Sequence, residues 1–387
     1  MRPRPVAVAG VYETRQAKRI TDASTTGLVL EAFRGALDDA GLSLADVDGV
    51  ASDWWGPGGA TVLPSSSDWA RQLGRPLNWI SDTLPAGPFA LVDAVAAIRD
   101  GRCSTVLIGG GQAGVLPGPG ETVASYTQLE NEFIGVWGAT TPTEFALLAR
   151  RHMDLYGTTP EQLAEVAAAI RNHGSINPNA VMYGRGPYDV AAVLASPMVS
   201  SPFHLLELSL VSEGAAAIVV TDRIDELRSA PVFCLAGGSE VRGNAYVNPP
   251  IYEQIGDMGE QLADRVFARA GLAREDIDVF GLYDPTVFEV IRQFEVLGYC
   301  KTGEGGPFVA DGRTRLGGSH PVNTDGGLLS HAHLRIHQMT QKVIEAVQQL
   351  RGLSGPRQVP GARTALVTAG GPPAGFYSMV ALGTEAP

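Results

Sequence analysis

A tyrosine and an aspartate stand together at the end of an apolar run in the second half of the chain. Residues 279–282 have the composition of a buried strand, and Tyr283 and Asp284 follow directly. Ligands in α/β proteins collect beyond the carboxyl ends of strands. There a phenol can exchange a proton with a substrate hydroxyl, while a carboxylate orients it or acts as the base. The alternative is structural: Tyr283 packs in the core, and Asp284 caps a helix that starts at Pro285.

A glycine-rich segment followed by three histidines forms a second cluster of polar residues. Glycines in the sequence NTDGG at 323–327 allow a ligand to approach the backbone closely. The histidines follow with the spacing HxHxxxH, which would put the last two on one helical face, as a metal site requires. Because no acidic third ligand is evident, we expect no metal. The cluster consists of Asn323, Asp325, Gly326, Gly327, His331, His333 and His337.

The three cysteines, Cys103, Cys234 and Cys300, are far apart and odd in number. Their spacing contains neither a disulfide framework nor a CxxC zinc pattern. We interpret each as a small buried thiol.

Composition and charge limit the possible partners. Of the 387 residues 44% are hydrophobic and only 18% charged, so a large core is possible and disorder is not expected. The net charge of -12 argues against nucleic acid or an anionic membrane surface as a partner. No run reaches the roughly 18 apolar residues of a membrane span, and the opening MRPRPVAVAG is a poor signal peptide. We therefore expect a cytoplasmic protein.

The chain contains an internal repeat that would position these clusters. AGLSLADVDGV at 40–50 matches AGLAREDIDVF at 270–280. A second pair follows in each half, since AVAAIRDG leads to TVLIGGG at 94–111 and AVQQLRG leads to TALVTAGG at 346–371. Two matches in the same order indicate a duplicated unit.

The repeated unit predicts alternating helices and buried strands. A helix over 25–40 ends at Gly41, a glycine suited to a left-handed cap, and its counterpart over 258–270 ends at Gly271. Continuous apolar runs at 105–111, 216–221, 233–238 and 364–371 predict strands buried on both faces. We expect two α/β halves, 1–225 and 226–387, with helices between sheets. The first half carries an insertion at about 112–205, with helices over 141–156 and 160–172.

Four long segments of this sequence resemble the thiolase superfamily, which has an αβαβα sandwich. They are YDPTVFEVIRQFEVLGYCKTGEGGPFV (283–309), GGSHPVNTDGGLLSHAHL (317–334), the stretch 141–180 and SPFHLLELSLVSEGAAAIVVT (201–221). They are similar to the branch of sterol-carrier-protein and lipid-transfer-protein thiolases, and within it to steroid side-chain aldolases.

The resemblance also shows what the chain lacks. It implies a nucleophilic cysteine at the N-terminus of a buried helix, where the helix dipole lowers the thiol pKa. Here that position falls at or near Leu84, next to Thr83, and the second thiolase cysteine would lie in TAGGPPAG at 368–375. Neither segment contains cysteine, so covalent Claisen chemistry is not expected.

The resemblance further implies a site where the N-termini of two central helices face each other. The first helix begins near Gly87 and the second at 323–327, and their free N–H groups would hold an enolate or thioester oxygen. His331 lies near the family's GHP histidine, within HAH. Tyr246 and Tyr252 lie in a loop where the family has tyrosines near the acyl pocket, and Tyr377 follows the last glycine-rich turn. All three are further candidates, although packing explains them as well.

These features favour retro-aldol cleavage of a β-hydroxyacyl-CoA, such as a steroid side chain. A base removes the β-hydroxyl proton and the leaving enolate is stabilised, so no nucleophile is needed. Coenzyme A is then part of the substrate, and no tightly bound cofactor is expected. The resemblance implies a homodimer and a small OB-fold, zinc-ribbon partner. Two alternatives remain: an acyltransferase without the usual cysteine, and a non-catalytic acyl-CoA-binding subunit.

Overall fold

The computed structural model describes residues 4–52, 67–82, 84, 87–114, 141–243, 250–334 and 337–387. Among the helices in these ranges, none combines the length and apolar character needed to cross a membrane.

One sheet of nine strands organises the molecule, in the order β3-β2-β4-β7-β1-β8-β11-β10-β9. The chain's first half contributes β1 (Ala7–Glu13), β2 (Gly49–Ala51), β3 (Trp79–Ile80), β4 (Thr105–Gln112) and β7 (Gly214–Thr221). The second half contributes β8 (Val232–Val241), β9 (Val279–Gly281), β10 (Thr364–Gly371) and β11 (Phe376–Gly383). A separate small sheet pairs β5 (Met198–Ser200) with β6 (Phe203–His204).

The two groups of strands have the same pairing pattern. In one, β2 and β4 are parallel, and β4–β7 and β7–β1 are antiparallel. In the other, β9 and β10 are parallel, and β10–β11 and β11–β8 are antiparallel. The groups join where β1 pairs with β8. This repeated order is what the duplicated sequence motifs predict.

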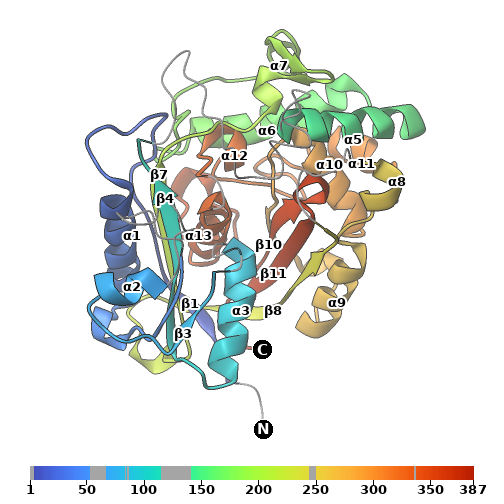
Figure 1. The fold of residues 1–387 in the computed structure, drawn as a ribbon. Coiled ribbons are helices and arrows are strands. Elements are labelled where there is room, and N and C mark those ends of the chain that lie inside the picture. The colour runs from blue at the N-terminus through green and yellow to red at the C-terminus, as the bar shows by residue number, and fades with distance from the viewer. Residues whose placement is uncertain are drawn as a thin grey trace.

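Four helices complete the layers of a thiolase-like sandwich (Figure 1). α1 (Thr25–Ala40) packs outside the first group of strands, and α9 (Glu260–Ala270) packs outside the second. α3 (Gly87–Arg99) and α13 (Gln338–Leu350) lie between them and contact strands of both groups. α1 and α9 end at Gly41 and Gly271, both left-handed, as expected.

The two central helices touch at their N-termini. Gly87 has a φ of +59°, and a Cβ there would lie 2.4 Å from the Cβ of Met339, in the first turn of α13. The Gly87 N–H also donates to Thr340 Oγ1 over 3.0 Å. The prediction that the second central helix begins at 323–327 is therefore wrong. That segment leads into a four-residue helix, α12 (Gly327–Ser330), because the chain turns again before α13.

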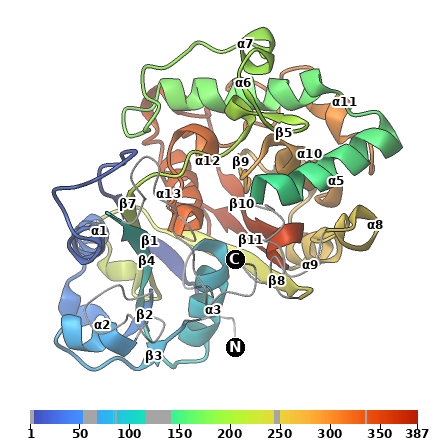
Figure 2. The same cartoon turned by 45° about the horizontal axis from the view of Figure 1, so that its top comes forward.

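A group of helices between β4 and β7, together with α10, covers the second half (Figure 2). α5 (Thr141–Tyr156) matches its predicted range, whereas α6 (Pro160–Ser175) continues three residues beyond its own. Thr159 caps the N-terminus of α6, and α6 contacts both α10 (Val287–Val296) and α12. The shorter helices are α2 (Ser67–Gln72), α7 (Val190–Leu194), α8 (Tyr252–Ile255) and α11 (Gly305–Val309).

Gly10 provides a test of how tightly α1 packs on β1. A Cβ at this position would lie 2.0 Å from the carbonyl oxygen of Ala36. Gly10→Ala is expected to lower the free energy of unfolding by about 1–3 kcal/mol, since the helix must shift outward. Urea denaturation measures this change.

Gly27→Ala in the first turn of α1 is the matched control. Its Cβ would meet only Ser24 Oγ, at 3.2 Å. This variant should be as stable as the parent or slightly more stable, because alanine is the better helix former. Equal stability of Gly10→Ala and the parent would contradict close packing at β1.

Candidate functional site

The main chain of Tyr283 is fixed by a buried polar network. Tyr283 follows β9, and its N–H donates to Thr368 Oγ1 over 2.9 Å. Its carbonyl accepts from Gln293 Nε2 over 2.7 Å. Gln293 Oε1 accepts in turn from Thr368 Oγ1, at 2.5 Å, and from the hydroxyl of Tyr377, at 3.1 Å. Tyr283 is 5% exposed, so its phenol is held in a nearly dry environment.

Asp284 is fully buried and paired with a lysine from α13. Its Oδ1 lies 2.6 Å from Lys342 Nζ, and both oxygens accept from the N–H of Leu328, at 3.1–3.2 Å. Burial raises the pKa of Asp284, and Lys342 opposes this shift. Asp284 does not cap the following helix, because α10 begins at Val287 with Thr286 as its N-cap. It binds the first turn of α12 instead.

The predicted glycine-rich segment forms a tight turn whose N–H groups already have acceptors. Gly326 N–H donates to the carbonyl of Asn323, and Gly327 N–H donates to Asp325 Oδ1, both at 2.9 Å. Asn323 has a φ of +47° and donates from Nδ2 to the carbonyl of Leu282 over 2.9 Å. These contacts join the turn to the segment after β9 that carries Tyr283. They also occupy the Gly326 and Gly327 N–H groups predicted to hold an oxyanion.

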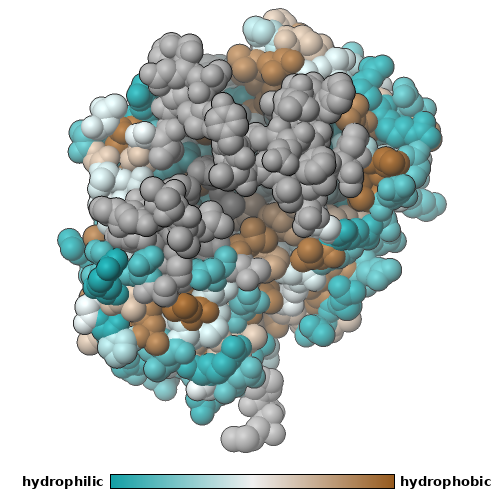
Figure 3. Space-filling model, in the orientation of Figure 1, coloured by the Kyte–Doolittle hydropathy of each residue, from teal (hydrophilic) through white to brown (hydrophobic). Residues whose placement is uncertain are grey.

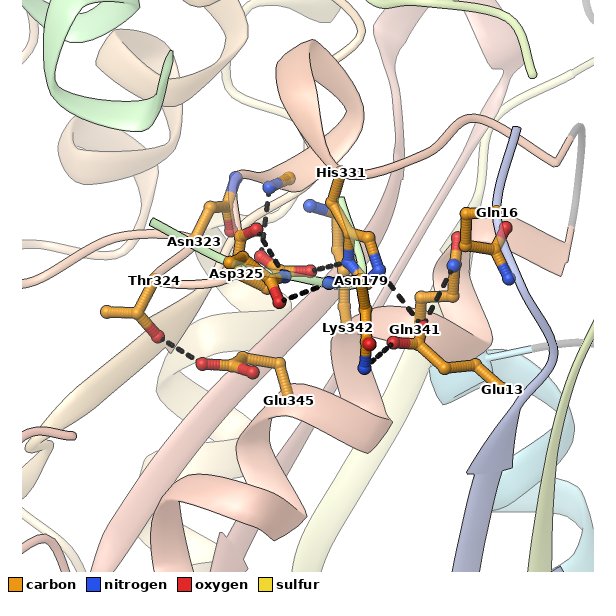
Figure 4. A network of polar contacts seen from close by, with 12 residues as sticks. Glu13, Gln16, Asn179, Asn323, Thr324, Asp325, His331, Gln341, Lys342 and Glu345 are labelled. Atoms are coloured by element: carbon orange, nitrogen blue, oxygen red, sulfur yellow. Dashed lines mark hydrogen bonds and ion pairs between the residues drawn. The ribbon is translucent and has the colours of Figure 1, made fainter. Parts of the chain in front are cut away.

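His331 lies between two carboxylates, one from each half of the chain (Figure 4). Its Nδ1 is 2.7 Å from Asp325 Oδ2, and its Nε2 is 3.1 Å from Oε2 of Glu13, on β1. Glu13 also accepts from Gln341 Nε2 of α13, at 3.2 Å. The imidazole is 4% exposed and thus joins the two halves inside the molecule.

The environment of His331 favours its charged form. Burial lowers the pKa of His331, but the carboxylates of Glu13 and Asp325 outweigh burial and raise it to about 10. For Asp325 burial acts in the opposite direction and raises the pKa, but the nearby imidazolium outweighs burial and lowers the pKa of Asp325 below its usual range. At neutral pH His331 is therefore an imidazolium, which can donate but not accept a proton.

A second buried network holds the other side of the turn against α13. Thr324 Oγ1 donates to Glu345 Oε1 over 2.7 Å (Figure 4). Arg357 Nη1 pairs with the same oxygen at 2.6 Å. Thr324 therefore ties the turn directly to α13.

The remaining site candidates lie apart from this network. Gly87 is at the start of α3, where it contacts Met339 and Thr340. Tyr252 is in α8 and packs against His152 and Tyr156 rather than against the turn. Tyr246 lies outside the described residues.

The histidine spacing does not produce a helical metal site. His333 is in an extended segment bridged to Val211, and His337 precedes α13, so the two do not share a helix. Across the ranges that the structure describes, no group of three or more His, Cys, Asp or Glu residues could hold a metal ion.

The described structure contains no activated thiol. Cys103 and Cys234 are buried, Cys300 is half-buried, and burial raises the pKa of each to about 12. Leu84, at the predicted nucleophile position, has a φ of +48°, which is rare for a branched side chain. Thr83 lies outside the described residues.

Sequence reasoning missed the partners that hold the candidates in place: Glu13, Gln293, Lys342, Glu345 and Thr368. Lys342 and Glu345 carried a signal, since charged residues in a helix flanked by apolar strands require buried partners. Glu13 carried none, because its contact with His331 spans most of the chain.

The chain belongs to the thiolase superfamily. Residues 257–384 match the family described as "Thiolase C-terminal domain-like". The chain is 32% identical to "Acetyl-CoA acetyltransferase" of Methanothermobacter thermautotrophicus, over 93% of this chain and 94% of that protein. It is also 32% identical to "17-hydroxy-3-oxo-4-pregnene-20-carboxyl-CoA lyase" of Mycobacterium tuberculosis, over 94% and 96%.

Solved structures agree with this assignment. The chain superposes on the structure "Ltp2-ChsH2(DUF35) aldolase" with a TM-score of 0.83 and 29% identity, covering 98% of both chains. Human mitochondrial 3-ketoacyl-CoA thiolase has the same fold, with a TM-score of 0.71, 15% identity and 98% coverage of both chains.

The Asp284–Lys342 pair predicts a large effect of removing the lysine. Lys342→Met leaves a buried carboxylate without its counter-charge, so the free energy of unfolding should fall by about 3–5 kcal/mol. Urea denaturation at pH 7 measures the loss. Lys342→Met with Asp284→Asn should recover much of it, because the unpaired charge is gone. If Lys342→Met alone is as stable as the parent, Asp284 is neutral in the folded protein.

The His331 cluster predicts a pH dependence of stability. The folded-state pKa of about 10 lies above the ordinary histidine pKa of 6.5, so this contribution is complete below pH 6.5 and is lost as pH rises toward 10. The urea midpoint of the parent should fall over this interval. The urea midpoint of His331→Gln should fall less than that of the parent over the same pH interval. Parallel pH profiles for the two proteins would contradict a charged His331.

Proposed function

We propose that this protein cleaves a β-hydroxyacyl-CoA by a retro-aldol reaction. The observation that carries the proposal is the buried Tyr283–Asp284 pair on a thiolase fold whose two cysteine positions hold none. Retro-aldol cleavage needs a base for the hydroxyl and stabilisation of an enolate, but no covalent intermediate. The relatives named as a lyase and as a steroid side-chain-cleaving aldolase (31% identical, Thermomonospora curvata) support it.

Tyr283 is proposed to accept the β-hydroxyl proton as a phenolate, after its own proton has passed to solvent. As the O–H bond breaks, the β-carbon becomes a ketone and the bond to the α-carbon breaks. The bonding electrons pass to the thioester as an enolate. Because hydrogen bonds fix both main-chain polar groups of Tyr283, the phenol starts from a defined position, which limits the entropy lost in reaching the substrate.

Asp284 is assigned an orienting role rather than that of the base. Its oxygens are already bound by Lys342 and the Leu328 N–H, so it holds α12 and α13 beside Tyr283.

His331 is proposed as a fixed positive charge near the enolate, held by Glu13 and Asp325. Asn323, Asp325, Gly326, Gly327 and Gly87 shape the substrate site through the turn and the start of α3. With the Gly326 and Gly327 N–H groups occupied, enolate stabilisation is assigned to the dipoles of α3 and α13.

The substrate is proposed to be an acyl-CoA with a bulky acyl group, such as a steroid side chain. Tyr252 is kept as a wall of the acyl pocket. Because the mechanism uses only side chains and helix dipoles, it requires no tightly bound cofactor.

Association with a small OB-fold, zinc-ribbon protein is proposed because the similar aldolase, Ltp2-ChsH2(DUF35), is a two-component complex by its name.

A homodimer is proposed from the resemblance. An apolar patch over the β5–β6 hairpin, where Met198, Val199 and Leu205 are each just over half exposed, offers a contact surface. Figure 3 shows brown residues near α7, at the top of the molecule. A tagged chain purified from its native host should retain such a protein; light scattering that gives the monomer mass would contradict both associations.

An acyltransferase is the second candidate, favoured by the relative named acetyl-CoA acetyltransferase. It would need a nucleophile, and each cysteine has a pKa raised to about 12 by burial. The product separates the two functions, since an acyltransferase joins or moves acyl groups, whereas the proposed lyase releases a ketone. Acyl-CoA binding without turnover would indicate a non-catalytic subunit.

The first experiment is turnover of 17-hydroxy-3-oxo-4-pregnene-20-carboxyl-CoA, the compound in the name of one relative. Mass spectrometry should detect a 17-ketone and propionyl-CoA. Tyr283→Phe is expected to reduce the rate by about 10²–10⁴-fold, the usual contribution of a general acid–base group. Calorimetry should show unchanged binding, because the variant lacks only the hydroxyl.

Tyr299→Phe is the matched control. Its hydroxyl donates to the carbonyl of Arg274 over 2.8 Å, outside the proposed site. This variant should retain activity. If Tyr283→Phe cleaves the substrate as fast as the parent, Tyr283 is not the base. If no hydroxyacyl-CoA is cleaved with the co-purified partner present, the retro-aldol proposal fails.

A further inference from the structure

Glu144, in the first turn of α5, is a buried carboxyl group that forms no ion pair with any of the described residues. Its side chain is 2% exposed. Its Oε2 has no hydrogen-bond donor among the described residues. An unpaired carboxylate in such a place costs several kcal/mol, so a buried group of this kind is normally protonated or serves a function.

α5 lies beside a segment that matters for thiolase chemistry. α5 contacts the 3-10 turn Pro372–Ala374, which joins β10 to β11. This turn belongs to TAGGPPAG, the segment where the resemblance places the second thiolase cysteine. Figure 2 shows the N-terminal end of α5 near the ends of β10 and β11.

The carboxyl groups of Glu289, near this turn, and of Asp284, in the proposed site, are already paired. Glu289 lies against Gly371, where a Cβ would approach its Oε1 to 3.0 Å, but it forms two bonds with Arg292, at 2.6 and 2.9 Å. Asp284 is held by Lys342. Glu144 differs from both, since none of the ion pairs in the described part of the chain includes it.

Burial raises the pKa of Glu144, so its neutral form is favoured. A neutral carboxyl group can donate a proton. The proposed reaction needs such a donor, because cleavage leaves a carbanionic α-carbon that must gain a hydrogen before the short acyl-CoA leaves.

We propose that Glu144 is the catalytic acid that protonates the α-carbon of the enolate. The inference rests on the proposed retro-aldol function and deepens it. The Glu144 O–H bond breaks, a C–H bond forms at the α-carbon, and the enolate electrons supply that bond. Glu144 is left as a carboxylate. The proton taken by Tyr283 from the β-hydroxyl returns to Glu144 through solvent, so the cycle is balanced without an oxidant or reductant.

The reverse of this step can be measured without any carbon–carbon cleavage. Propionyl-CoA is incubated with the protein in D₂O, and mass spectrometry follows deuterium entering the α-carbon. The parent should catalyse exchange. Glu144→Gln, which cannot donate or accept the proton, should exchange at least about 100-fold more slowly. Glu144→Asp should recover part of the rate.

Glu207→Gln is the control for replacing a buried glutamate. Glu207 is fully buried and burial also raises its pKa, but its Oε2 is bound by the N–H of His204. This variant should exchange like the parent, and a thermal melt confirms that all variants fold. The proposal is overturned if Glu144→Gln exchanges at the parent rate, or if the parent cleaves hydroxyacyl-CoA without catalysing exchange.

This design separates the inference from the function on which it rests. Exchange that depends on Glu144, in a protein that cleaves no hydroxyacyl-CoA, would support the acid and refute the retro-aldolase. If cleavage depends on Tyr283 but deuterium exchange does not depend on Glu144, the retro-aldolase is supported and the role of Glu144 as the acid is refuted.

Discussion

The structure depends on matching buried charges around α13. This helix lies between two groups of strands, where an unpaired charge is very costly. Lys342 is matched by Asp284, and Glu345 by Arg357, while Asp325 and Glu13 share His331. Because these contacts reach from β1 to the loop after β9, the position of Tyr283 relative to the first half of the chain is set by ion pairs as much as by apolar packing.

The scaffold has a thiolase fold but no cysteine in either of the two segments where the resemblance places the thiolase cysteines. The start of α3 meets the start of α13, and Leu84, at the position predicted for the nucleophile, has a left-handed backbone. A thiolase uses this arrangement to hold an acyl group on sulfur. A protein that only needs to stabilise an enolate can use the same helix dipoles with oxygen acids and bases. Under the proposed function, the absence of both cysteines therefore changes the reaction but not the class of substrate.

The sequence predicted the fold well because the helices and strands follow from short, local sequence patterns. Apolar runs, glycine caps and the repeated AGL motif are each short, and they located α1, α5, β4 and β10. The site was harder. The turn at 323–327 looked like a helix start, but Asn323 adopts a left-handed conformation and Asp325 turns back onto Gly327. The partner of His331 could not be inferred, since Glu13 meets it only after the halves have joined.

The pairing of β1 with β7 and β8 has a consequence for synthesis of the chain. Ala7 pairs with both Thr221 and Phe233, so β1 leaves the ribosome long before either neighbour exists. At 5–20 residues per second, roughly 200 residues take about 10–40 s to translate. During that time an apolar strand with two open edges is available to other chains. Protection by chaperones should therefore matter most while the first half emerges, and a circular permutant that begins at β8 would supply one of the two neighbours before β1 emerges.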